Sequence, residues 1–143
     1  MQQDARLRLE DLLDREIELA RSLAATLAAE RTSLTGDSPA AVEQNAANKT
    51  RVLASIEKLE EERRALCGDP LNSGLGATVK ERWRALMALM AGCRTANEVN
   101  GHIIHVRQHQ VRQLIDIVRG GPAMTYDNHG KTFAKALRDL ARA

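Results

Sequence analysis

The longest uninterrupted pattern in this chain runs from Val79 to Val118 and predicts a single long helix. Alternating steps of four and three residues meet mostly apolar side chains, and no proline lies inside the stretch. This spacing keeps residues on one helical face. The positions are Val79, Trp83, Leu86, Met90, Cys93, Asn97, Asn100, Ile104, Arg107, Val111, Leu114 and Val118. A helix over about residues 78–119 would be roughly 60 Å long.

Two earlier helices are predicted at about residues 4–34 and 38–67. The first places one apolar face at Leu9, Leu13, Ile17, Ala20, Ala24 and Leu27. Ser38 is a favourable N-cap and Pro39 suits the first helical position, so the second helix opens there. Its seam is Val42, Asn45, Lys49, Val52, Ile56, Leu59, Arg63 and Leu66. Only the C-terminal half of this seam is apolar, so we expect the N-terminal half to pack loosely or to be exposed.

Short connections join these helices and favour antiparallel neighbours. Gly68 and Pro70 end the second helix, and Thr78 with Glu81 forms a predicted capping box for the third. The chain has only three aromatic residues, which favours slender helices over a β-fold. We therefore expect an all-α, elongated, antiparallel three-helix bundle resembling a coiled coil over residues 1–119. Residues 120–143 should form a flexible tail with a short amphipathic segment.

Polar residues interrupt the long helix at core-type positions. Asn97, Asn100 and Arg107 occupy its seam, and Gly101 lies beside them. Buried polar groups need partners, and glycine costs about 1 kcal/mol against alanine in a helix. A sequence that keeps these residues uses them for helix register, for close packing or for binding.

These same residues carry a family resemblance. The pattern Asn-x-x-Asn-Gly-x-x-Ile-x-x-Arg at 97–107, followed after a Gly-Gly-Pro break by Tyr126-Asp127-Asn128-His129-Gly130, resembles the FlgN-type flagellar export chaperones. The resemblance implies a cytosolic chaperone that binds the C-terminal helices of hook-associated (hook–filament junction) proteins. It also implies that such a chaperone prevents premature assembly and delivers its clients to the type III export gate. By resemblance, the C-terminal region holds the client and Tyr126 assists docking at the gate's membrane protein.

The candidate partner-binding residues combine the polar segment, the end of the long helix and the tail. In the tail, Phe133, Leu137 and Leu140 form a narrow apolar stripe. The full set is Asn97, Asn100, Gly101, Ile104, Arg107, Val111, Leu114, Tyr126, Gly130, Phe133, Leu137 and Leu140.

Charge argues against a nucleic-acid partner, because 21 basic and 19 acidic residues are nearly balanced. Residues 79–119 are nevertheless basic, with seven basic and three acidic side chains. They either complement the acidic first helix or face an acidic partner. We expect no signal peptide and no membrane insertion, and therefore a cytoplasmic protein in which Cys67 and Cys93 are reduced thiols.

Catalysis and metal binding find little support in the sequence. No nucleophile has a convincing base, and no glycine-rich phosphate loop follows a strand. His102, His105 and His109 share one stripe that could approach a metal or could be a solvated, pH-sensitive face. We expect no enzyme activity, no metal and no cofactor, and a monomer or weak homo-oligomer. The alternative function is a structural coiled-coil scaffold or self-associating adaptor, which should be an obligate oligomer.

Overall fold

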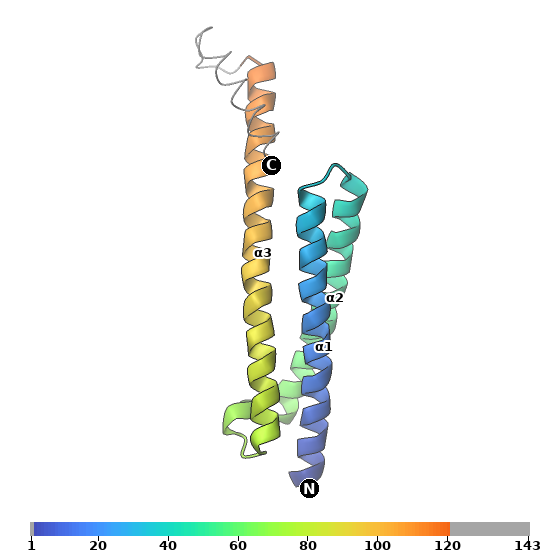
Figure 1. Ribbon diagram of the computed structural model, residues 1–143, viewed down its shortest axis with the longest axis vertical. Coiled ribbons are helices and arrows are strands. Elements are labelled where there is room, and N and C mark those ends of the chain that lie inside the picture. The colour runs from blue at the N-terminus through green and yellow to red at the C-terminus, as the bar shows by residue number, and fades with distance from the viewer. Residues whose placement is uncertain (1, 121–143) are drawn as a thin grey trace. The chain divides into compact units, whose positions relative to one another are not determined.

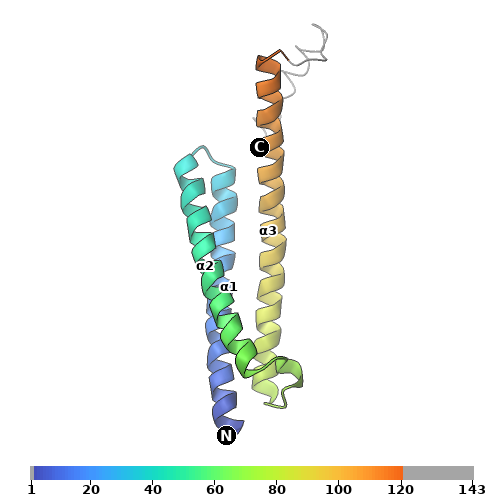
Figure 2. The same ribbon diagram turned by 180° about the vertical axis from the view of Figure 1, so that it is seen from behind.

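The structure, a computed structural model, describes residues 2–120 and contains three long helices (Figure 1). Helix α1 spans Gln2–Leu34, α2 spans Pro39–Leu66 and α3 spans Ala77–Val118. A short 3-10 helix, η1, covers Pro70–Asn72 between α2 and α3 (Figure 2). No β-strand occurs within residues 2–120, and the predicted all-α class is confirmed.

The start of α2 follows from its first residues. The Ser38 hydroxyl accepts a hydrogen bond from the backbone N–H of Ala41 at 3.2 Å, and Pro39 takes the first helical position. A side-chain cap of this kind satisfies a backbone donor that has no partner within the helix. The predicted start of α2, with Ser38 as N-cap and Pro39 as first helical residue, is therefore confirmed.

The start of α3 differs from the prediction. The helix begins at Ala77, and the N–H of Lys80 donates to the carbonyl of Gly76 at 3.4 Å. Gly76 has a positive φ of 103°, which a residue with a side chain rarely adopts. Thr78 consequently lies inside the first turn, and its hydroxyl donates to Glu10 of α1. The predicted capping box between Thr78 and Glu81 is wrong, because Thr78 is used to join two helices.

The described residues divide into two units at a boundary between Glu98 and Val99, and α3 contributes to both. The first unit contains α1, α2, η1 and α3 as far as Glu98. In the second unit, α3 continues through Gly101 to Val118 without interruption. None of the helices described within residues 2–120 has both the length and the apolar character needed to cross a lipid bilayer.

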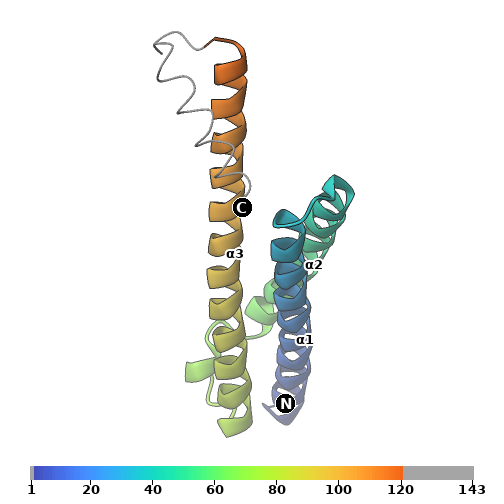
Figure 3. The ribbon, with the colours of Figure 1, turned by 45° about the horizontal axis from the view of Figure 1, so that its top comes forward.

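Ion pairs and hydrogen bonds define the helix directions in the first unit. Glu16 of α1 pairs with Arg63 of α2, and Glu30 pairs with Lys49, so α1 and α2 are antiparallel. They lie side by side in Figures 1 and 3. Asp14 of α1 accepts from Arg82 of α3 just as Glu10 accepts from Thr78, so α1 and α3 run parallel. Consecutive helices therefore alternate in direction, as the short connections predict.

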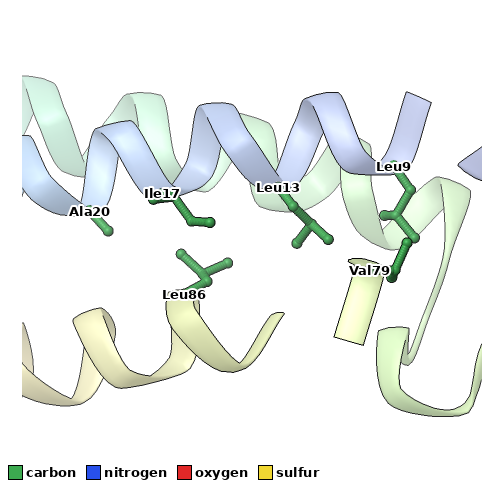
Figure 4. Close-up of a cluster of buried hydrophobic side chains, with 6 residues drawn as sticks. All are labelled: Leu9, Leu13, Ile17, Ala20, Val79 and Leu86. Atoms are coloured by element: carbon green, nitrogen blue, oxygen red, sulfur yellow. The ribbon is translucent and has the colours of Figure 1, made fainter. Parts of the chain in front are cut away.

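Two apolar clusters hold the first unit together. In the first, side chains of α1 face side chains of α3 (Figure 4), and its buried members are Leu9, Leu13, Ile17, Ala20, Val79 and Leu86. The second cluster is built on Leu23, Leu27 and Cys93. Burying each large aliphatic side chain contributes about 1.5–3 kcal/mol, so these contacts dominate the stability of the unit.

The buried face of α1 is wider than the sequence predicted. Ala24 was expected on this face but is exposed, whereas Leu12 and Leu23 are buried. The reason is that α1 contacts both α2 and α3, so its apolar surface spans more than one narrow stripe. In α2, only Leu59 and Arg63 are buried, and both lie in its C-terminal half. The expected loose packing of its N-terminal half agrees with this distribution.

Candidate partner-binding site

The polar segment of α3 separates into residues with different environments. Asn100 is buried, with 1% of its surface exposed, whereas Asn97 is exposed. Gly101 is also exposed, and a methyl group added there would meet no described side chain within 4 Å. The structure thus provides no close approach that would require glycine at this position. Close packing at Gly101 is therefore not the use of this segment, and helix register and partner binding stay as its predicted uses.

Downstream of this segment, α3 carries an apolar stripe that extends to its last residue. Val111, Leu114, Ile115 and Val118 follow the i, i+3, i+4, i+7 spacing of one helical face. Leu114 is half-buried, while Val111, Ile115 and Val118 are 49%, 41% and 79% exposed. We call these four residues the α3 terminal stripe. Exposed apolar side chains gathered on one face, rather than scattered singly, are typical of an interaction surface.

Arginines flank this stripe and give its surroundings a positive charge. Arg107 and Arg112 lie with Gln108 and Val111 around a shallow surface hollow, and Arg119 follows the last residue of α3. Ile104 and Arg107 are half-buried. Tyr126, Gly130, Phe133, Leu137 and Leu140 lie outside the described residues, so their part in the predicted site stays a prediction.

A groove with a volume of about 590 Å³ opens in the first unit between α1, α2 and the first part of α3. We call it the unit-one groove. Its lining residues are Leu23, Leu27, Lys49, Leu53, Met87, Met90, Ala91, Cys93, Arg94 and Asn97. Apolar side chains dominate, and Leu53 of α2 and Met87 of α3 are 42% and 41% exposed. Asn97 is a predicted binding residue that lines this groove, whereas the other lining residues were not predicted as a site.

The charged residues that line the unit-one groove are both cations. Lys49 Nζ lies 3.3 Å from an oxygen of the buried Glu30, so its charge is largely compensated. Arg94 is exposed and makes no ion pair with any residue between 2 and 120. Cys93 lies deeper, its Sγ 3.6 Å from the carbonyl oxygen of Ala20, and burial raises the pKa of its thiol. A thiol with a raised pKa is a poor nucleophile, so Cys93 is suited to packing.

Sequence reasoning also missed a buried ion pair that joins the helices of the first unit. Arg63 Nε donates to both oxygens of Glu16 at 3.2 and 2.9 Å, and both side chains are almost completely buried. The Arg63 guanidinium also lies 4.6 Å from the ring centroid of Trp83 in α3. Burial raises the pKa of Glu16, and the nearby Arg63 charge opposes part of that rise. The available signal was Arg63 itself, since a cation in an apolar seam requires a buried partner.

The histidine stripe has no described metal partners. His102, His105 and His109 are all exposed on α3. Within residues 2–120, no three histidine, cysteine, aspartate or glutamate side chains are arranged to hold a metal ion. The three histidine side chains are therefore in contact with solvent in the part of the chain that the structure describes.

Comparison with known proteins relates this chain to a protein family. A protein-family model described as FlgN protein matches residues 1–133 of this chain. The matched range includes both the Asn-Asn-Gly segment of α3 and the Tyr126–Gly130 segment. No curated protein and no solved structure matches the chain.

Proposed function

This chain belongs to the FlgN family of flagellar export chaperones, and on that premise we propose that it holds hook-associated proteins in the cytoplasm and delivers them to the type III export gate. The clients are the hook–filament junction proteins, bound through their C-terminal amphipathic helices. Such helices polymerise after export, so their apolar faces must be covered beforehand.

The observation that carries this proposal is the α3 terminal stripe. Its three exposed residues, Val111, Ile115 and Val118, form an apolar face about two helical turns long. An amphipathic client helix laid against this face would bury apolar surface on both partners, as in other complexes that recognise helices by i, i+3, i+4 and i+7 contacts. Each aliphatic side chain that becomes fully buried contributes about 1.5–3 kcal/mol. The client's own apolar face gains burial in the same contact, and the two contributions together must exceed the cost of association and ordering.

The remaining predicted residues extend this surface in both directions along the chain. Upstream, Ile104 and Arg107 lie on the same helix, one to two turns before Val111. Downstream, the tail residues Phe133, Leu137 and Leu140 supply further apolar groups by sequence. We propose that the client contacts both parts and that Tyr126, with Gly130, serves docking at the membrane protein of the export gate.

The direct test replaces Val111 by glutamate and measures binding of a purified hook-associated protein by calorimetry. A carboxylate in the stripe must lose its water when the client binds, which costs free energy even beside Arg107 and Arg112, so we expect the client affinity to fall at least tenfold. Leu7→Glu is the matched control, because Leu7 of α1 is 51% exposed and Val111 is 49% exposed. Leu7→Glu should leave client binding unchanged. Equal client affinity for wild type and Val111→Glu would remove the stripe from the binding site.

Two further measurements separate delivery and self-association from client binding. Tyr126→Ala should preserve client affinity while lowering export of the client from living cells. Sedimentation should show wild type mainly as a monomer. Wild type could instead be an obligate oligomer that the Val111→Glu substitution dissociates. That result would favour the structural scaffold, because the stripe would then form the contact with a second copy of the chain.

A further inference from the structure

We propose that the unit-one groove is a second binding site, separate from the α3 terminal stripe, for an amphipathic helix of a partner protein that carries a carboxylate beside its apolar face. The proposal concerns residues 1–98 and goes beyond client binding by the end of α3. It rests on the shape of the groove, on the exposure of its walls and on the sign of its charges.

The shape of the groove fits a helix. The residues that α3 contributes run from Met87 to Asn97, which is about 15 Å or nearly three turns at 1.5 Å per residue. The backbone groups of the surrounding helices are already hydrogen-bonded within those helices, so no strand can be added there. An occupant must therefore bind by side-chain packing. A short helix lying between α2 and α3 does this and would complete a four-helix arrangement around this part of α1.

The walls of the groove retain apolar surface that is not covered within residues 2–120. Leu53 on α2 and Met87 on α3 are each about two-fifths exposed, while Leu23, Leu27 and Cys93 line the depth of the groove. Met87 and Met90 are flexible and polarizable side chains that adapt to the shape of a bound helix. These residues supply the apolar part of the recognition.

The charges of the groove select the kind of helix. Lys49 is already paired with Glu30, so Arg94 is the cation that an occupant would face. A carboxylate next to the occupant's apolar stripe can form a charge-assisted hydrogen bond with Arg94, whereas a cation there would be repelled. The end of this chain is disfavoured as the occupant, since residues 131–143 contain Lys131, Lys135, Arg138 and Arg142 against a lone Asp139.

The test uses two fluorescent, helix-forming peptides about four turns long that share a leucine stripe. One carries glutamates beside the stripe, and its twin carries lysines at the same positions. Titration with the full chain at low ionic strength should show at least tenfold tighter binding of the glutamate peptide. Arg94→Glu should reverse that preference, and Met87→Glu should weaken binding of the glutamate peptide at least tenfold. Circular dichroism checks folding, and Leu53→Glu on the opposite wall replaces Met87→Glu if that variant unfolds.

A second measurement needs no substitution in the groove. The chain has two cysteines, and Cys93 lines the groove whereas Cys67 does not. Saturation with the glutamate peptide should slow labelling of Cys93 by a thiol reagent, as followed by mass spectrometry. Labelling of Cys67 should keep its rate and so serves as the internal control. Because Cys93 is 4% exposed, a peptide that merely stabilised the fold would slow the labelling of both thiols. Equal slowing of both thiols, or unchanged labelling of Cys93, would therefore overturn the proposed location.

Other outcomes assign the groove differently or remove it as a site. Absence of binding, or binding that Val111→Glu abolishes and Met87→Glu leaves intact, overturns the proposal. A tenfold gain in peptide affinity after deletion of residues 121–143 would make the chain's own tail the occupant. A dimer that Met87→Glu dissociates would make the occupant a second copy. Client calorimetry separates the two proposals, since Met87→Glu should leave hook-associated protein binding unchanged whether or not Val111→Glu lowers it.

Discussion

Arg63 lies where the three helices of the first unit meet. It pairs with Glu16 of α1 and stacks on Trp83 of α3 while belonging to α2. Removing one member of a buried ion pair leaves the other charge without compensation, which costs about 3–5 kcal/mol. We therefore expect Arg63→Ala to lower the free energy of unfolding by about that amount in urea titrations.

Arg64 provides the matched control one residue away. Its side chain is 68% exposed, so Arg64→Ala should change the free energy of unfolding by no more than about 0.5 kcal/mol. Replacing both Glu16 and Arg63 by leucine should recover most of the stability lost in Arg63→Ala, because no charge then stays buried. Equal stability of Arg63→Ala and Arg64→Ala would contradict the importance of the pair.

Glu16 gives the pair a defined pH dependence. Burial raises the pKa of Glu16 above its ordinary value of 4.5, so the folded chain holds this proton more tightly than the unfolded chain. The resulting stabilisation is complete below 4.5 and is lost as pH rises through the raised pKa. Glu16→Gln lacks this titration. The unfolding free energy of wild type minus that of Glu16→Gln should therefore increase as pH falls from neutral toward 4.5. A difference that decreases over the same range would show that Arg63 outweighs desolvation.

The sequence indicated one member of this ion pair, Arg63, but not its partner Glu16. Arg63 stands at a seam position of α2 between Leu59 and Leu66, which already implied a buried cation. Its partner could not be identified, because α1 carries seven acidic residues and the choice among them depends on the register between α1 and α2. Register arises from the packing of whole helices and is not encoded at one position.

At the scale of elements, helix locations were more predictable than helix contacts. Ser38 and Pro39 act locally, so the start of α2 could be predicted from them. Thr78 resembled a cap by the same local rule, yet it bonds Glu10, which is 68 positions away in the sequence. The exposure of Ala24 has the same origin, since the face that α1 buries depends on two neighbours rather than on its own periodicity. The unit-one groove was unpredictable for this reason as well.

Gly101 and Gly92 allow a test of whether the polar segment of α3 binds a partner. Both lie inside α3, and a methyl group added at either meets no described side chain within 4 Å. Glycine-to-alanine changes in helix interiors add about 0.5–1 kcal/mol of stability. We expect Gly101→Ala and Gly92→Ala to raise the midpoint of thermal unfolding to a similar extent.

The two glycine variants should differ in client binding. Gly101 belongs to the Asn-Asn-Gly segment proposed for binding, and Gly92 does not. If a client helix approaches the backbone closely at Gly101, the added methyl group will lower client affinity in calorimetry. Gly92→Ala then reports the effect of helix stabilisation alone. Identical client affinities for both variants would restrict the segment to a role in register.

At the scale of the whole molecule, the division into two units predicts that stability and client binding can be separated. Both apolar clusters of the first unit, and its buried ion pair, lie within residues 1–98. Deleting residues 121–143 removes none of these contacts. We therefore expect the deletion to leave the midpoint of thermal unfolding nearly unchanged when followed by circular dichroism.

The same deletion should lower client affinity, although it leaves stability nearly unchanged. The deleted residues include Phe133, Leu137 and Leu140, and burying each of them on a client would contribute about 1.5–3 kcal/mol. Ordering a segment on binding costs about 2–5 kcal/mol, so the net gain stays moderate and the client remains releasable. A loss of at least tenfold in client affinity is therefore expected by calorimetry.

The triple variant with Phe133, Leu137 and Leu140 replaced by serine should lose as much affinity as the deletion. Client affinity that survives the deletion would assign binding to the α3 terminal stripe alone, because no tail side chain would then remain to contribute.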